Sequence, residues 1–209
     1  MGKQEWIELI KTVVTIGTLI FAAIQVHLLR KQIKKEHEKR RRENTVETLR
    51  NWCASLGKNT SLAVDVAEQL SFPQCKKLYD KESFDVTYDI KNDICRFCGF
   101  EKNNQNQACQ YCSLFQKKEN DRLVVDGWIL RELRWHVVSY LNALETVFVS
   151  WHLGLVDDST IEEQLAYLRN PKKGDGLANF RHASGGYPIT ETFIDQIKDK
   201  PKTDHKKHL

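Results

Sequence analysis

Proline and glycine are scarce in this chain of 209 residues, which contains four prolines and ten glycines. Neither residue occurs between Thr18 and Leu56. Because these two residues interrupt helices most strongly, one long helix is predicted from the N-terminal region to about Trp52. Internal repeats and low-complexity tracts are also missing, apart from the polar C-terminal tail, so a repeat architecture is not indicated.

A strong charge of one sign is absent from most of the chain. The net charge is +4 at pH 7, and the eight Lys/Arg and two Glu between Arg30 and Arg42 account for it. The remaining residues are close to neutral, so composition does not indicate a general affinity for nucleic acid. With 41% hydrophobic residues, the roughly 180 residues after the N-terminal segment can form one domain with a packed core.

Charged residues are rare from Ile7 to Leu29, a stretch that contains only Glu8 and Lys11. As a helix it would be roughly 35 Å long, which is enough to cross a hydrocarbon core of about 30 Å. A cleaved signal peptide is disfavoured because the apolar segment is long, no small-residue cleavage site follows, and the next residues are basic. The stretch therefore predicts a membrane-spanning helix.

A polar stripe runs along one side of this helix. Its members recur at alternating steps of four and three, within an arc of about 100°: Gln4, Glu8, Lys11, Thr15, Thr18, Ala22 and Gln25. One interpretation is a plain anchor, because threonine can bond back to its own helix. The other is a helix that packs in a homo-oligomer and lines or closes a pore. The candidate pore or helix-interface residues are then Lys11, Thr15, Thr18, Ala22 and Gln25.

The basic run from Arg30 to Arg42 predicts the orientation in the membrane. The first eleven residues contain two Lys and two Glu, so the positive charge lies after the span. The positive-inside rule predicts a single-pass protein of the inner (cell) membrane, with the N-terminus outside and the C-terminal domain in the cytoplasm. The same run is expected to contact anionic lipid headgroups, with nucleic acid as the alternative partner.

The fold is predicted to be mainly α, with the transmembrane helix continuing into a cytoplasmic helical bundle. Four parts are expected: residues 1–29 as extracytoplasmic end and transmembrane helix, 30–52 as basic juxtamembrane helix, 53–198 as cytoplasmic helical domain, and 199–209 as polar tail. Leu49 and Trp52 are expected to begin the cytoplasmic core. A small zinc-knuckle insertion is expected at residues 93–115.

Local patterns predict the elements of the cytoplasmic domain. The longest is a helix at 121–155, whose apolar stripe includes Trp128 and which stops at Gly154. The others are a helix from Asn59 or Thr60 that ends at Phe72-Pro73, a strand or irregular lead-in in SFDVTYDI, a helix opened by a capping box at Ser159-Thr160-Ile161-Glu162, a loop in GDGLANFRHASGGYP and a last helix in ITETFIDQIK.

Four cysteines form the pattern CxxC-x10-CxxC: Cys95, Cys98, Cys109 and Cys112. Two such pairs can give four thiolates to one tetrahedral ion, and Gly99 suits the positive φ of the turn after Cys98. Structural zinc is the predicted cofactor, with iron or disulfides as alternatives; a cytoplasmic location disfavours disulfides. Cys53 and Cys75 are interpreted as ordinary, partly buried cysteines.

Arg131 and His136 form an R-x4-H pattern on the predicted long helix. Imidazole can transfer a proton near neutral pH, and guanidinium can stabilise phosphate charge, so the pair is a candidate catalytic site of a ribonuclease. The two residues lie about 140° apart around one helix, and they could converge only at a helix end or across a dimer. The alternative is a structural role, in which Arg131 or Arg134 forms an ion pair with Glu145 or Asp126.

The span, its basic continuation, RRENTVETLRNW and YLNALETVFVSWHLGLVDDSTIEEQ together resemble an uncharacterised family of small bacterial single-span membrane proteins. With the R-x4-H pattern added, the chain is similar to the membrane accessory (HEPN-like) proteins of type VI-B CRISPR systems. This resemblance covers most of the chain except 93–115. It implies an oligomeric, pore-forming or membrane-perturbing effector in antiphage defence, with a CRISPR effector or RNA as partner. The alternatives are a membrane-tethered HEPN-type ribonuclease and a zinc-stabilised membrane scaffold, and no small-molecule substrate is expected.

Overall fold

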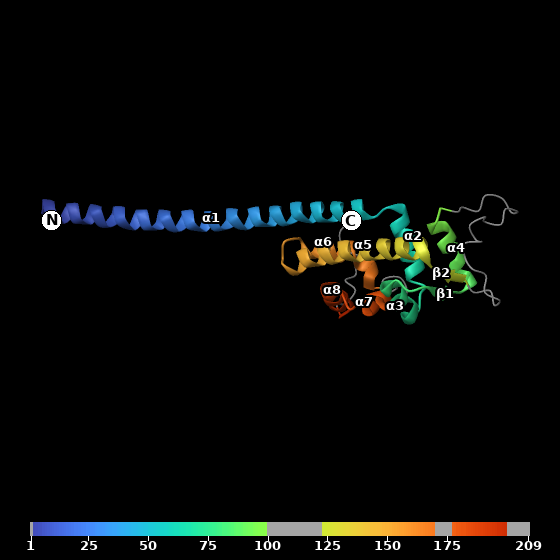
Figure 1. Ribbon diagram of the computed structural model, residues 1–209. Coiled ribbons are helices and arrows are strands. Elements are labelled where there is room, and N and C mark those ends of the chain that lie inside the picture. Colours follow the sequence, from blue (N-terminus) through green and yellow to red (C-terminus); the bar gives the residue numbers. More distant parts are fainter. Residues whose placement is uncertain (1, 100–122, 170–176, 200–209) are drawn as a thin grey trace, which may run out of the picture. The chain divides into compact units, whose positions relative to one another are not determined.

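The computed structural model describes residues 2–99, 123–169 and 177–199 and contains two compact units, residues 1–44 and 45–209 (Figure 1). Its architecture is mainly helical, as predicted. The helix α1, Lys3–Ser55, is one uninterrupted helix of 53 residues, which confirms the long helix expected from the absence of proline and glycine.

Within the described ranges, α1 is the one helix that is long and apolar enough to cross a membrane. Its apolar segment has a mean hydropathy of 1.3, and none of that segment is buried. The large apolar side chains in this stretch are all at least half exposed: Val14, Ile16, Leu19, Ile20, Phe21, Ile24, Val26, Leu28 and Leu29. A helix of a soluble protein buries one such face, so these features indicate a single candidate span near the N-terminus.

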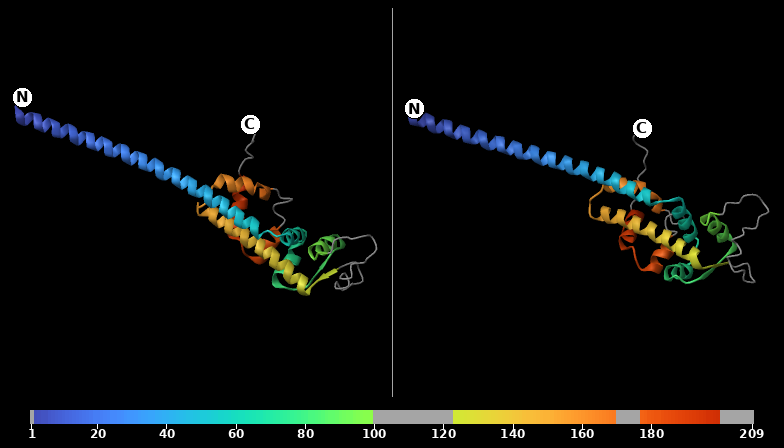
Figure 2. Two further views of the ribbon diagram at one scale, coloured as in Figure 1. Left: turned by 90° about the horizontal axis from the view of Figure 1, so that it is seen from above. Right: turned by 45° about the horizontal axis from the view of Figure 1, so that its top comes forward.

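The second unit begins with the last turns of α1 and continues as short helices around one long helix (Figure 2). The long helix is α5, Gly127–His152. The other elements of this unit are α2 (Lys58–Ala67), α3 (Phe72–Asp80), β1 (Phe84–Val86), α4 (Tyr88–Phe97), β2 (Leu123–Val125), α6 (Asp158–Gln164), the 3-10 helix η1 (Ala166–Arg169), α7 (Ala178–Ser184) and α8 (Pro188–Asp199).

Two hydrophobic clusters share α5. Leu133 and Leu141 pack in the first cluster with residues of α2, α3, α4, α7 and both strands. Phe148 packs in the second cluster with residues of α6, η1 and α8. Leu49 and Trp52 pack against this second cluster, which confirms that the core begins near the end of α1.

The two strands form an antiparallel pair, in which Phe84 lies opposite Val125 and Val86 lies opposite Leu123. This pairing brings together the two ends of the chain segment that connects the strands. The helix α4 opens that segment, and its buried Ile94 belongs to the first cluster. The base of the predicted insertion is therefore fixed to the core.

Three short helices, α3, α4 and α7, were not predicted by the sequence patterns. Phe72-Pro73 was interpreted as the end of a helix, but Pro73 lies in the first turn of α3. Proline is tolerated there because the N–H groups of the first turn have no hydrogen-bond partner within the helix. A loop was predicted where α7 forms. Phe180 of α7 is fully buried, so packing stabilises this helix in a sequence rich in glycine.

Helix ends differ in detail from the prediction. The segment 121–155 is not helical throughout, because residues 123–125 form β2 and α5 begins at Gly127. Gly154 stops α5 with φ 66°, as predicted. Asp157, rather than Ser159, caps α6: its carboxylate accepts a hydrogen bond from the backbone N–H of Thr160 at 2.9 Å. An acidic cap at this position also favours the positive end of the helix dipole.

Candidate functional site

The polar stripe lies on an unbroken and exposed part of α1. The side chains of Thr15, Thr18, Ala22 and Gln25 are all exposed, whereas the side chain of Lys11 lies outside the described part of the structure. The hydroxyl of Thr18 donates a hydrogen bond to the carbonyl of Val14 at 2.8 Å. Because this bond satisfies the hydroxyl within its own helix, Thr18 can face either lipid or a second helix.

Small side chains follow each other along this stripe. Thr18 and Ala22 are four residues apart and Thr15 lies one turn earlier, so the three share one side of α1. Small residues at this spacing let two membrane helices approach closely, which favours packing between helices. The stripe can thus act as a seam between copies of α1.

The R-x4-H residues lie in different surroundings on α5. Arg131 is exposed, whereas His136 is half-buried and its Nδ1 lies 3.1 Å from the hydroxyl oxygen of Thr60 on α2. The ring of His136 also makes edge contacts with Phe97, at 5.7 Å between centroids, and with Trp135, at 4.8 Å. Within one chain the structure does not bring the guanidinium and the imidazole together. His136 instead joins α5 to α2 and α4.

Burial lowers the pKa of His136, and the negative charge of Glu132 offsets part of this effect. The neutral imidazole is therefore favoured near pH 7. A neutral imidazole can accept a proton, but Thr60 already occupies one of its nitrogens. This arrangement fits a structural histidine and leaves only the second ring nitrogen for other contacts.

An ion pair between Arg134 and Glu145 was one predicted alternative, and it is wrong because each residue has other partners. Arg134 donates from Nε to the carbonyl of Tyr79 at 2.8 Å, and its guanidinium lies 5.2 Å from the centre of the Tyr79 ring. Glu145 accepts hydrogen bonds from the backbone N–H groups of Ile189 and Thr190, at 3.0 and 2.9 Å. Glu145 thus holds the first turn of α8, which the sequence patterns did not suggest.

Trp128 was assigned to the apolar stripe of the long helix, but it is 45% exposed. Trp135, seven residues later on the same side of α5, is 61% exposed. Arg131 lies between them, so this side of the helix carries two aromatic rings and a cation. The i, i+7 spacing of the tryptophans was the available sequence signal for this surface.

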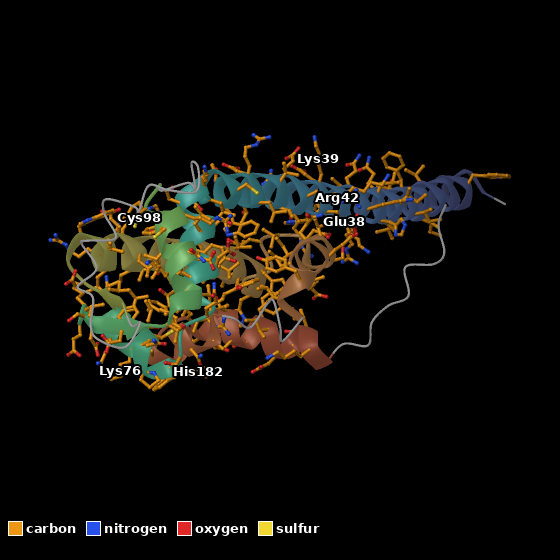
Figure 3. All side chains as sticks on the ribbon, turned by 90° about the vertical axis from the view of Figure 1, so that its right-hand side faces the viewer. Glu38, Lys39, Arg42, Lys76, Cys98 and His182 are labelled. Carbon is orange, nitrogen blue, oxygen red and sulfur yellow. The ribbon has the colours of Figure 1, made fainter. Side chains whose placement is uncertain are left out.

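Only one pair of the predicted metal ligands falls in the described residues. Cys95 lies in the last turn of α4 and Cys98 follows as its C-terminal cap (Figure 3), so the two share one side of the helix. Gly99 has φ 82°, as predicted for the turn after Cys98. Cys109 and Cys112 lie outside the described residues. Within the described residues, no group of three or more His, Cys, Asp or Glu side chains could hold a metal ion.

The remaining cysteines differ from the prediction that both are partly buried. Cys53 is exposed and Cys75 is fully buried. Burial raises the pKa of the Cys75 thiol to about 12. Cys75 is thus an inert core residue rather than a reactive thiol.

A tyrosine pair was missed by the sequence analysis. The hydroxyl oxygens of Tyr140 on α5 and Tyr167 on η1 lie 3.2 Å apart. Burial raises the pKa of both phenols, and the nearby negative charge of Glu68 acts in the same direction. Both hydroxyls therefore stay protonated near neutral pH, and the pair connects two helices rather than supplying a base.

Comparison with known proteins finds no matching family, no matching curated protein and no matching solved structure. Functional proposals for this chain therefore rest on its own residues.

Proposed function

We propose that this chain is a single-span membrane protein that assembles through α1 into an oligomeric effector, which opens or perturbs the membrane. The observation that carries this proposal is the uninterrupted α1, with exposed apolar side chains around most of its surface and a stripe of small and polar residues on one side. The distribution of Lys and Arg supports an orientation with the N-terminus outside and the helical domain in the cytoplasm.

The apolar side chains support insertion into lipid. Removing one Val, Leu, Ile or Phe side chain completely from water contributes about 1.5–3 kcal/mol. For the half-exposed side chains between Val14 and Leu29, the total gain is on the order of 10 kcal/mol. This gain favours a membrane environment over water.

The stripe supports self-association rather than plain anchoring. Lipid offers no hydrogen-bonding partner to Gln25, whereas a neighbouring copy of α1 does. Thr15, Thr18 and Ala22 permit the close approach that such a contact needs. In an oligomer these residues face the bundle interior, where they line or close a pore.

Two adjacent alanines provide a matched test of the full-length protein. Ala22 belongs to the stripe, whereas Ala23 lies about 100° further around the helix at nearly the same depth. Ala22→Leu is expected to weaken association about 5–150-fold, because overpacking a close interface costs about 1–3 kcal/mol. Ala23→Leu is expected to leave association and permeability unchanged. Oligomeric state in detergent and dye uptake by expressing cells measure the two properties.

Three results would contradict this proposal. The seam is wrong if Ala22→Leu and Ala23→Leu give the same oligomer as the unsubstituted chain. The pore is wrong if Thr15→Leu/Thr18→Leu leaves permeability unchanged. The effector is also wrong if the protein assembles normally and no variant alters dye uptake. If His136→Ala then abolishes RNA cleavage by the protein, a membrane-tethered ribonuclease is the better assignment. A role in CRISPR-associated antiphage defence stays a prediction of the sequence resemblance.

We also propose that Cys95, Cys98, Cys109 and Cys112 hold one structural zinc ion. The spacing of the four thiols, the position of one pair at the end of α4, and the positive φ of Gly99 support this proposal. The antiparallel strands fix the base of the segment that carries all four residues. With four protein ligands the ion would order this segment and have no open position for water.

A further inference from the structure

The basic run after the candidate span contains two groups of four cations. The membrane-proximal cluster consists of Arg30, Lys31, Lys34 and Lys35, and the distal cluster consists of Lys39, Arg40, Arg41 and Arg42 (Figure 3 labels Lys39 and Arg42). Glu36 and Glu38 lie between them. All of these residues belong to the same unbroken helix, so their positions around and along α1 follow from helix geometry.

Ion pairing distinguishes the two clusters. In the distal cluster, Arg40 pairs with Glu36 at 2.8 Å and Lys39 pairs with Glu43 at 3.7 Å. The four cations of the membrane-proximal cluster are exposed and form no ion pair with any described residue. The charge nearest the span is therefore available to an external anion.

The membrane-proximal cluster occupies one side of α1. Arg30 and Lys34 lie one turn apart, as do Lys31 and Lys35, and the two rows are adjacent. At about 100° per residue, the centre of this cluster lies about 160° around the helix from the centre of the polar stripe. A helix that packs through its stripe therefore points these cations away from its neighbours.

We propose that the membrane-proximal cluster binds the phosphate groups of anionic phospholipids in the inner leaflet. This proposal rests on the proposed span, which places Leu29 at the edge of the hydrocarbon core. The cluster then lies roughly 2–9 Å beyond that edge, within reach of a headgroup layer about 5–7 Å thick. Long Lys and Arg side chains can place their charges at this level while their stems contact lipid.

The same geometry favours lipid over nucleic acid. Nucleic acid in solution would meet the distal cluster first, because that cluster begins about 15 Å beyond Leu29. At this distance the distal charges are more than a Debye length of about 8 Å from the headgroups. The ion pairs with Glu36 and Glu43 weaken the distal cluster as an anion site. Among the described residues, no glutamate forms an ion pair with any of the four membrane-proximal cations.

Two double variants of the full-length protein test this proposal. Lys34→Gln/Lys35→Gln removes two charges from the membrane-proximal cluster, and Lys39→Gln/Arg40→Gln removes two charges from the distal cluster. Each protein is placed in nanodiscs of equal amounts of phosphatidylglycerol and phosphatidylcholine, and the lipids retained on release are measured by native mass spectrometry. The unsubstituted chain is expected to retain mainly phosphatidylglycerol. Its preference should fall roughly tenfold to thirtyfold in the first variant and remain in the second, because each cation near the surface favours anionic lipid about fivefold.

Alkaline extraction of cell membranes separates failure of the span from failure of the lipid site. If the unsubstituted chain is extracted, the span itself is wrong and the lipid proposal falls with it. If the chain stays in the membrane but shows no lipid preference, or if both double variants lose it equally, the lipid site alone is wrong. The lipid site is also overturned if Lys34→Gln/Lys35→Gln keeps the lipid preference but loses binding to a single-stranded RNA.

Discussion

Glu145 offers the most direct test of how the helical domain is held together. Its carboxylate is the acceptor for the backbone N–H groups of Ile189 and Thr190 and for the hydroxyl of Thr190. These donors belong to the first turn of α8, and Thr190 is fully buried. Glu145→Ala would remove a negative charge from the positive end of a helix and leave buried donors without an acceptor.

The size of the effect follows from these contacts. A buried donor that loses its partner costs about 1–3 kcal/mol, and loss of a helix cap costs about 0.5–2 kcal/mol. Because these contributions overlap, we expect Glu145→Ala to lower the free energy of unfolding by about 3 kcal/mol. For a domain of this size, 1 kcal/mol corresponds to about 2–4 °C. The midpoint of thermal unfolding should therefore fall by about 6–12 °C.

Thermal unfolding of the full-length protein in mild detergent, followed by circular dichroism, measures this shift. Glu132→Ala is the matched control, because Glu132 lies on the same helix and is exposed. Its effect is expected to stay within about 0.5 kcal/mol. Glu145→Gln keeps the shape of the side chain and one acceptor oxygen, so its unfolding midpoint should lie between those of Glu145→Ala and Glu132→Ala. Equal midpoints for Glu145→Ala and Glu132→Ala would show that the carboxylate does not hold α8.

Two further predictions concern the metal site and the half-buried His136. Cys95→Ser is expected to reduce the zinc content of the purified chain from one ion to nearly none, whereas Cys53→Ser should keep the ion. Elemental mass spectrometry measures the zinc content, and equal zinc in both variants would contradict the four-cysteine site. His136 has a lowered pKa in the folded domain, so the unfolded chain binds more protons as the pH falls below 6.5, the ordinary value for histidine. The domain should therefore lose stability as the pH falls from 6.5 to the lower pKa of the folded state, and His136→Asn should show less of this loss in denaturant titrations.

The features predicted correctly depend on local sequence. The absence of proline and glycine between Thr18 and Leu56 was enough to predict the continuous α1. Gly99 and Gly154 were correctly assigned positive φ or a helix stop, because a short stretch of chain determines each. For SFDVTYDI the alternation allowed a short strand or an irregular lead-in, and the strand β1 forms there.

The features that were missed depend on residues distant in sequence. Glu145 contacts Thr190, 45 positions later, and His136 contacts Thr60, 76 positions earlier. No local periodicity encodes either distance. The helix α7 forms in a predicted loop because Phe180 is buried in the first cluster, and this burial outweighs the weak helical tendency of its flanking sequence. Local sequence features therefore located α1 and α5 better than they located the contacts of the polar residues on α5.

The opposite placement of the stripe and the membrane-proximal cluster limits the arrangements open to the proposed oligomer of α1. If the cations faced the bundle interior, like charges about 10 Å apart would repel by about 0.4 kcal/mol per pair even in water, and several such pairs would add. In the proposed oligomer, with the stripe inside, the same cations would face the surrounding headgroups, so the proposed association and the proposed lipid binding would require one orientation of the helix. The proposed association and the proposed lipid binding also depend on separate residues. Ala22 lies within the stripe, whereas Lys34 and Lys35 lie about three turns later on the opposite side. Sites this far apart act nearly independently, so weakened association and lost lipid preference can be assigned to different faces of α1.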